Sequence, residues 1–414
     1  MPDIADAVEQ SRFRSAFRHR SYALFWSARL SAWLAGQMQA VAVGWQMYEL
    51  TSDPLDLGLV GLFQFLPQLL LTLVAGHVVD SRDRRRILLA ALLLETVGMT
   101  ALLVLTAAGA AAPAPIFAVV FLLGVAKAFA GPAHSALIAA VVPTEDLPNA
   151  VAWNSSAIQV STIGGPALGG LLYIAGPAVV YGVGTALLTI ATIFVLALRP
   201  RPVEPAPRGV GWGSMLAGFS FIRSRRDILG AISLDMVAVL LGGATALLPV
   251  YARDILDVGP WGLGLLRSAP ALGALTTAMV LARWSVNRRA GWHLLVAVMT
   301  FGAATVAFGL STEPVLSGVA LFALGAADEV SVFVRQTLIQ LSTPDQMRGR
   351  VGAVSGLFIG ASNQLGAFES GATAALFGTV PAVVAGGVGA VLIALVWAWR
   401  FPELRRIDRL LATR

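Results

Sequence analysis

The sequence contains no cysteine and only one lysine, and each absence excludes a class of protein. Without cysteine the chain forms no disulfide and no thiolate metal site. The single lysine, Lys127, is followed by Ala128 in an apolar segment, so the Gly-Lys-Ser/Thr phosphate loop of nucleotide-driven pumps is missing. The four histidines stand far apart, and the Gly-x-Ser-x-Gly motif of many hydrolases does not occur. We therefore expect no metal, no cofactor and no enzymatic activity.

Charge is also scarce in this chain. Charged residues make up 13% of the sequence and hydrophobic residues 57%, and the mean hydropathy is +0.76, unlike a soluble domain. The net charge of +6 does not indicate nucleic acid, because the basic residues lie in short loops beside apolar segments. Apolar segments of roughly 20 residues, each able to cross a bilayer as a helix, recur about twelve times. The composition thus predicts an all-α polytopic membrane protein with twelve transmembrane helices.

The predicted spans are separated by short connections, with one longer connector in the middle of the chain. Residues 199–227 form this connector, because their Pro and Gly residues prevent a continuous helix. Its second part, 214–222, is expected to form an amphipathic helix on the membrane surface. The predicted spans are 22–48, 56–79, 87–108, 114–140, 149–173, 177–198, 228–252, 260–283, 291–311, 314–341, 350–373 and 379–400.

Arginine occurs in alternate gaps between these spans. Twenty-four of the 28 arginines fall at the two termini and in the even-numbered gaps, whereas the odd-numbered gaps contain only Arg253. The positive-inside bias makes the arginine-rich side the cytoplasm. Both termini are therefore predicted to be cytoplasmic.

The chain also repeats itself at about half its length. Residues 121–143 align with residues 322–344 at a constant offset of 201, and a second segment aligns near an offset of 203. The repeat predicts two pseudo-symmetric six-helix bundles, residues 1–198 and 228–414, joined by the connector. Substrate is expected to bind between such halves, near the middle of the membrane.

Residues 76–88, GHVVDSRDRRRIL, resemble the signature loop of the major facilitator superfamily. Residues 48–89, 214–222 and 343–354 are similar to its enterobactin-exporter-like, drug-efflux branch. The resemblance implies twelve helices and the outward export of a small molecule. Within the loop the pattern is matched by Gly76, Asp80, Arg84 and Arg85.

This loop is expected to act as a conformational latch. Gly76 would allow close helix approach, Asp80 would accept hydrogen bonds from backbone N–H groups at a neighbouring helix N-terminus, and the arginines would pair with acidic groups or lipid phosphates. The alternative is that the arginines of this loop only place it on the cytoplasmic side through the positive-inside bias. Asp83 departs from the superfamily pattern, in which glycine is common at this position.

The segment GGPALGG, residues 164–170, matches the terminal half of the superfamily's exporter-associated motif. Its glycines are expected to permit tight contact with a helix of the other half, and its proline to bend the span. A generic contact between small residues is the alternative. The matching residues are Gly165, Pro166, Gly169 and Gly170.

Several charges lie inside predicted spans, where they are costly and therefore indicate function. Lys127 and His134 share one helix face, and their repeat equivalents are Asp328 and Arg335. Lys127 and Asp328 are expected to face one another across the central cavity, or else to form ion pairs within their own halves. Glu329 points about 100° away from Asp328.

Two further charges lie in the cytoplasmic third of the membrane. Arg29 and Asp235 either pair across the halves as a gate or have separate local partners. Glu95 is in a span that is peripheral in the superfamily, so we expect it to have a structural partner.

These features predict a secondary active exporter of an amphiphilic small molecule, such as a siderophore or drug. Because the sequence has no nucleotide site, proton antiport through a buried acid is the simplest energy source for export. The alternatives are an importer or facilitator and, from other classes, a lipid scramblase or an integral membrane enzyme. The arginine- and alanine-rich composition favours the inner membrane of a bacterium. Protons and lipids are the other expected partners, and a monomer the expected state.

Overall fold

The computed structural model describes residues 15–201, 212–284 and 289–407. These residues are almost entirely helical and contain no strand, so the predicted all-α class is confirmed. Most of the proline- and glycine-rich part of the connector, residues 202–211, lies outside the described residues, as do several loop and terminal arginines of the topology argument.

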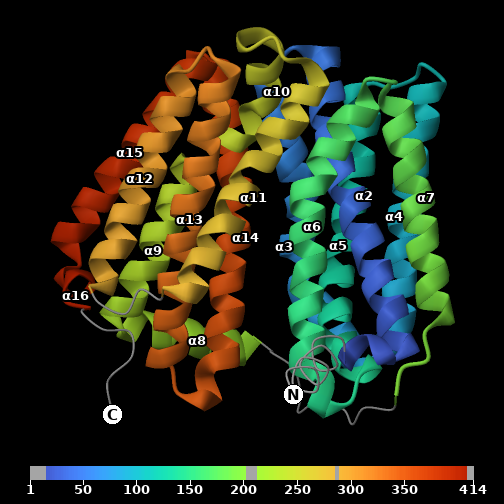
Figure 1. Ribbon diagram of the computed structural model, residues 1–414, viewed down its shortest axis with the longest axis horizontal. Coiled ribbons are helices and arrows are strands. Elements are labelled where there is room, and N and C mark those ends of the chain that lie inside the picture. The colour runs from blue at the N-terminus through green and yellow to red at the C-terminus, as the bar shows by residue number, and fades with distance from the viewer. Residues whose placement is uncertain (1–14, 202–211, 285–288, 408–414) are drawn as a thin grey trace, which may run out of the picture. The chain divides into compact units, whose positions relative to one another are not determined.

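Every predicted span corresponds to a helix, and in one case to an interrupted helix (Figure 1). All bounds lie within three residues of the predicted ones except those of α14. Proline stands in the first turn of α5, α7 and α13, where its missing N–H costs nothing. The helices are α2 (Arg20–Thr51), α3 (Pro54–Ser81), α4 (Arg84–Ala107), α5 (Pro113–Val141), α6 (Leu147–Tyr173), α7 (Pro177–Ala197), α9 (Arg226–Leu241) with α10 (Leu248–Val250), α11 (Gly259–Arg283), α12 (Ala290–Leu310), α13 (Pro314–Ser342), α14 (Asp345–Phe377) and α15 (Thr379–Arg400).

The prediction of one continuous helix over 228–252 was wrong. α9 ends at Gly242–Gly243, a 3-10 turn η3 (Ala244–Leu247) follows, and after α10 the chain continues as a wide turn η4 (Tyr251–Ile255). A Cβ added to Gly243 would lie 2.4 Å from the carbonyl oxygen of Gly366 in α14. The backbones therefore touch where the helix breaks, and only glycine fits there.

Nine helices of the described chain are long and apolar enough to cross a membrane by composition alone. The spans at α2, α6 and α14 are not among them, although these helices contain 32, 27 and 33 residues. Glutamine, serine and glycine dilute their apolar character, as in α2 with Gln37, Gln39 and Gln46. Such composition is typical of helices that face other protein segments more than lipid.

The chain divides into two compact units. One comprises Met1–Val43 and Leu66–Gly209, the other Gly44–Phe65 and Val210–Arg414. The helices α2 and α3 each run from one unit into the other without a turn. The division at the connector, 1–198 and 228–414, stays a prediction, because the outer ends of α2 and α3 group with the second unit.

In the first unit α4 packs against α5 and α7, and α2 packs along α6. The Tyr22 hydroxyl donates to the Ala150 carbonyl at 2.7 Å, and Trp26 Nε1 donates to the Trp153 carbonyl at 2.8 Å. Before α2, the short turn η1 (Ser15–Arg18) packs beside α6. The neighbouring His19 lies 2.8 Å from Asp146, and this hydrogen bond lowers the pKa of the Asp146 carboxyl.

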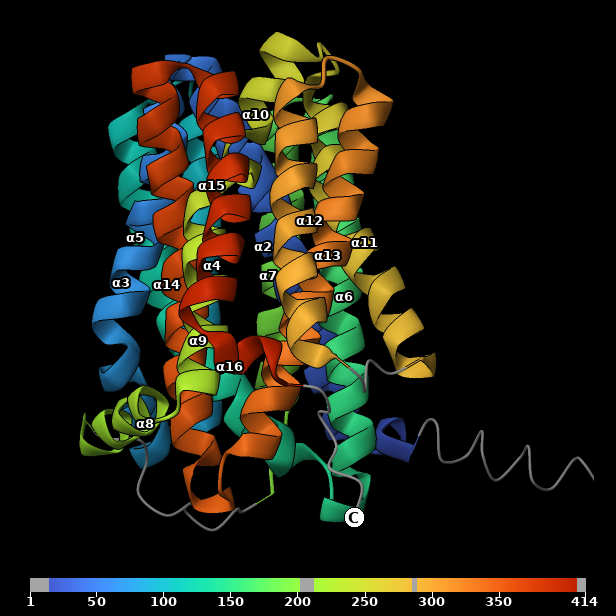
Figure 2. The same ribbon diagram turned by 90° about the vertical axis from the view of Figure 1, so that its left-hand side faces the viewer.

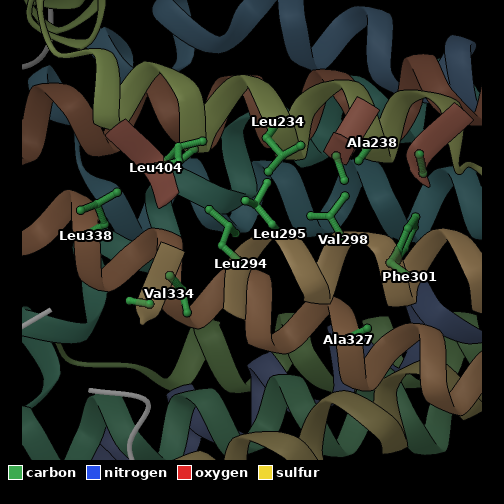
Figure 3. Close-up of a cluster of buried hydrophobic side chains, with 14 of the residues drawn as sticks. Leu234, Ala238, Leu294, Leu295, Val298, Phe301, Ala327, Val334, Leu338 and Leu404 are labelled. Carbon is green, nitrogen blue, oxygen red and sulfur yellow. The ribbon is translucent and has the colours of Figure 1, made fainter. Parts of the chain in front are cut away.

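In the second unit an apolar core forms where α9, α12, α13 and α15 meet (Figure 3). A smaller cluster joins α8 (Trp212–Ser224) to α9 and α14 through Ile222, Ile228 and Val351. α8 lies across the ends of these helices (Figure 2), with Leu216 and Phe219 exposed, so the predicted amphipathic helix is present. The core in Figure 3 includes Leu234, Ala238, Leu294, Leu295, Val298, Phe301, Ala327, Val334 and Leu338.

Candidate functional site

A buried ion pair joins α9 to α13 in the second unit. The Arg335 guanidinium donates to the Asp235 carboxylate at 2.7 Å, and the two side chains are only 2% and 6% exposed. Ser331 lies one helical turn before Arg335 and donates to the same carboxylate at 3.3 Å. Asp235 therefore has local partners, the alternative left open by the sequence.

Asp328 lies seven residues before Arg335, on the same face of α13, and interacts electrostatically with both Asp235 and Arg335. Unlike Asp235, it makes no hydrogen bond and no ion pair with any described residue. Glu329 is half-buried beside it. The cluster of Asp235, Asp328, Glu329 and Arg335 thus contains three acidic groups and one basic group. The basic group, Arg335, already forms an ion pair with Asp235.

The first unit contains a corresponding set of groups. Lys127 on α5 interacts electrostatically with Glu95 on α4, and α4 and α5 pack side by side. Glu95 thus has the structural partner expected of it. The single lysine of the chain has a carboxylate near it within its own unit.

Arg29 and His134 lie close together between α2 and α5. His134 is 5% exposed, its Nδ1 lies 3.0 Å from the Ala130 carbonyl, and its ring packs on Phe25 with centroids 5.8 Å apart. The Arg29 guanidinium lies over the Trp33 ring, 5.9 Å from its centroid, and interacts electrostatically with His134. Arg29 Nε and His134 Nε2 are buried without a hydrogen-bond partner among the described residues.

Two expected pairings join residues of different units, Lys127 with Asp328 and Arg29 with Asp235. They stay predictions, because the two units are described separately. What the structure adds is that Lys127 and Asp235 each have an oppositely charged group close by in their own unit.

The signature loop is held to helix ends of its own unit. Arg84 donates to the Ala136 carbonyl at 3.4 Å, and Arg85 donates to the carbonyls of Val195, at 3.0 Å, and Leu196. The Val195 and Leu196 carbonyls belong to the last turn of α7, where the helix dipole favours cations. The arginines thus bind backbone oxygen atoms, a partner that the sequence did not suggest.

The latch roles of Gly76 and Asp80 stay predictions. A Cβ at Gly76 would meet no atom within 4 Å, and Asp80 is exposed and accepts no hydrogen bond within the described chain. The N-cap of α4 is Asp83, which accepts from the backbone N–H groups of Arg85, at 2.9 Å, and Arg86, at 3.3 Å. The sequence signal for this helix cap is an aspartate directly before an arginine-rich helix start, and the sequence analysis did not use it.

The glycine motif of α6 packs against α2 of its own unit, and its expected contact with a helix of the other half stays a prediction. A Cβ on Gly165 would lie 2.5 Å from Gln37 Cβ, and one on Gly169 would lie 3.0 Å from Met38 Cα. Pro166 and Gly170 are buried in the same helix. The motif is therefore a backbone contact between parallel spans one and five.

A third polar group, at the outer ends of the helices, was not predicted. The Tyr48 hydroxyl of α2 donates to Asp254, and Arg253 donates to the Tyr48 carbonyl at 2.9 Å. Arg253 also lies over the Tyr48 ring. Its position as the single arginine of the odd-numbered gaps was the available signal.

The arrangement can change charge within the membrane but shows no means of holding a metal. No group of three or more potential metal ligands occurs among the residues that the structure describes. Within the described residues it combines one buried ion pair, Asp235–Arg335, with a carboxyl, Asp328, and a guanidinium, Arg29, that form no ion pair.

Comparisons with known proteins agree with this description. A family model described as "Transmembrane secretion effector" matches residues 11–412. The chain is 27% identical over 393 residues to the enterobactin exporter EntS of Citrobacter koseri, covering 94% of this chain and 93% of that protein. It is 26% identical over 392 residues to the enterobactin exporter EntS of Shigella dysenteriae serotype 1, with the same coverage.

Solved structures show the same fold at low identity. A bacterial homolog of the human lysosomal transporter Spinster has a TM-score of 0.73 at 14% identity, covering 95% of this chain and 98% of that one. A POT family transporter in complex with a thioalcohol-conjugated peptide has a TM-score of 0.74 at 11% identity, covering 93% and 96%. The chain therefore belongs to the transmembrane secretion effector family of the major facilitator superfamily and is a multi-pass membrane transporter.

Proposed function

We propose that this protein is a proton-coupled exporter in the inner membrane of a bacterium. It moves an amphiphilic small molecule, such as a siderophore or drug, out of the cytoplasm by alternating access. The observation that carries the proposal is the cluster of Asp235, Asp328 and Arg335. Its one guanidinium pairs with the buried Asp235, and the half-buried Asp328 has no ion pair within the described chain. Similarity to enterobactin exporters over 94% of the chain supports outward transport.

The cluster supports coupling through its charge balance. Arg335 and Ser331 compensate the charge of Asp235 through an ion pair and a hydrogen bond. Asp328 has neither an ion pair nor a hydrogen bond within the described chain, and an uncompensated carboxylate away from water is costly. Asp328 therefore takes up a proton when it faces the acidic side and releases it when it faces the cytoplasm.

The test is transport into inside-out proteoliposomes, with an imposed pH gradient and with enterobactin and ethidium as separate probes. Asp328→Asn keeps the size of the side chain but cannot change charge, so gradient-driven accumulation of the transported probe should be lost while downhill exchange persists. Glu329→Gln is the matched control on the adjacent helix face and should still concentrate the probe. Lys127→Ala should impair both gradient-driven and downhill transport.

The outcomes separate this function from its alternatives. A variant Asp328→Asn that still concentrates the probe would place the coupling acid elsewhere, with Asp235 and Glu329 next to test. Accumulation that the wild-type protein achieves without any gradient dependence would indicate a facilitator, and uptake opposite in direction would indicate an importer. Gradient-independent movement of labelled phospholipid between leaflets would indicate a scramblase, and chemical conversion of the probe an enzyme.

A further inference from the structure

The two units carry ionisable pairs at equivalent places. Arg29 lies nine residues after the first residue of α2 (29 − 20), and Asp235 lies nine residues after the first residue of α9 (235 − 226). His134 lies seven residues before the end of α5 (141 − 134), and Arg335 seven before the end of α13 (342 − 335). The first and fourth spans of each repeat thus carry two ionisable side chains at equivalent positions along the helices.

The two pairs differ in how their charges are satisfied. In the second unit a guanidinium meets a carboxylate at 2.7 Å, and the pair is almost inaccessible. In the first unit the guanidinium of Arg29 interacts electrostatically with the His134 imidazole without a hydrogen bond between them, and no ion pair in the described chain includes Arg29. Because the Ala130 carbonyl only accepts hydrogen bonds, His134 Nδ1 carries the proton of the neutral ring. His134 therefore offers an acceptor at Nε2 but no counter-charge for Arg29.

The N–H donors of Arg29 make no hydrogen bond to any residue that the structure describes. Its Nε is buried, and its terminal nitrogens are not among the buried atoms without a partner. One face of the guanidinium is covered by Trp33, whose side chain is 36% exposed. A guanidinium that stacks on a ring keeps its N–H groups at the edge, in the planar fork that binds two oxygen atoms at once.

We propose that Arg29, with His134 behind it and Trp33 beside it, is the binding site for an oxyanion of the exported molecule. The ligand's carboxylate or phenolate takes the place that Asp235 occupies in the equivalent pair of the second unit. An aromatic ring attached to that oxyanion packs on the exposed part of Trp33. The substrate class is thus an anionic aromatic amphiphile. That the bound anion is an exported substrate rests on the proposed function. The binding site itself can be tested without transport.

A binding measurement on the purified full chain in neutral detergent tests the site without transport. Salicylate is the probe, and salicylamide is its neutral counterpart of similar size and shape. Quenching of tryptophan fluorescence reports binding, and isothermal titration calorimetry confirms it. The wild-type protein should bind salicylate at least tenfold more tightly than salicylamide, because the amide cannot supply the missing charge.

Two substitutions of Arg29 separate charge from geometry. Arg29→Gln should weaken salicylate binding at least tenfold and leave salicylamide binding unchanged. Arg29→Lys keeps the charge without the planar fork, so its affinity should lie between those of the wild type and Arg29→Gln. His134→Gln should change salicylate affinity less than Arg29→Gln, because the neutral ring carries no charge. Arg253→Gln, an arginine at the outer helix ends, is the matched control and should bind like the wild type.

The same chemistry could be supplied by a lipid phosphate, and a competition arm distinguishes the sources. If phosphatidylglycerol in mixed micelles displaces salicylate from the wild type but has no effect on Arg29→Gln, the site is a lipid headgroup site and the substrate assignment is overturned. Equal salicylate binding by wild type and Arg29→Gln, or no salicylate binding at millimolar concentration, overturns the site itself. Intact binding by a protein that fails in proteoliposome export would refute the proposed function alone.

Discussion

At the scale of single residues, the most constrained group is the Asp235–Arg335 pair. Both side chains are buried, so removing one partner leaves an uncompensated charge in an apolar environment. We expect Asp235→Asn to lower the free energy of unfolding by about 3–5 kcal/mol, the range typical of broken buried pairs. Unfolding of the detergent-solubilised protein by heat or urea, followed by tryptophan fluorescence, measures this loss.

A double variant provides the control for this prediction. Asp235→Leu combined with Arg335→Met removes both charges at similar volume, so the protein should keep most of the stability that the single substitution loses. If the double variant is as unstable as Asp235→Asn, packing and not charge explains the constraint on Asp235. The transport of such a variant would further show whether Asp328 couples without its neighbours.

At the scale of helices, the bounds of the spans could be predicted from the sequence, but the contacts between residues of different helices could not. Span bounds follow from hydropathy and from prolines in first turns, which are local properties. The break at Gly242–Gly243 depends on a backbone contact with Gly366, a residue more than a hundred positions away, which no local pattern reveals. The contact of the α6 glycines with α2 also joins residues far apart in the sequence, and so do the hydrogen bonds from Arg84 and Arg85 to backbone carbonyl groups. No local pattern reveals these contacts.

In the candidate site, too, the sequence predicts which residues matter but not which residues they contact. Its ionisable residues could be found from sequence alone, because charge within a span is rare and costly. The pairing of Asp235 with Arg335 could not, since Arg29, expected in the same third of the membrane, was an equally reasonable partner. The role of Asp83 as a helix cap was hidden by comparison with a superfamily pattern that has glycine there.

Two glycines of α6, five residues apart, give a matched pair of substitutions for testing helix contact. Gly169→Ala places a methyl group 3.0 Å from Met38 Cα, and backbone atoms cannot yield as a flexible side chain can. We expect a loss of about 1–3 kcal/mol from overpacking. Gly164→Ala meets nothing within 4 Å and should be neutral or slightly stabilising because alanine favours helix. Equal thermal stability of both variants would contradict the close α2–α6 contact.

At the scale of the whole molecule, the repeat is visible in the helix lengths. α5 and α13 both contain 29 residues and begin 201 positions apart, the offset that the sequence alignment predicted. The two repeats differ in the charges of their first and fourth spans. One has an ion pair between these spans, and in the other the guanidinium of Arg29 forms no ion pair within the described residues.

The passage of α2 from one compact unit to the other, between Val43 and Gly44, has a consequence for local unfolding. One continuous helix belongs to two cooperative units, so its two ends need not open together or with the same free energy. Amide hydrogen exchange should therefore show two levels of protection along α2. Tyr48→Phe, which removes the hydroxyl bound to Asp254, should speed exchange only after Gly44. Tyr22→Phe, which removes the bond to Ala150, should speed it only before Val43. A uniform change along the helix in either variant would mean that α2 opens as a single piece.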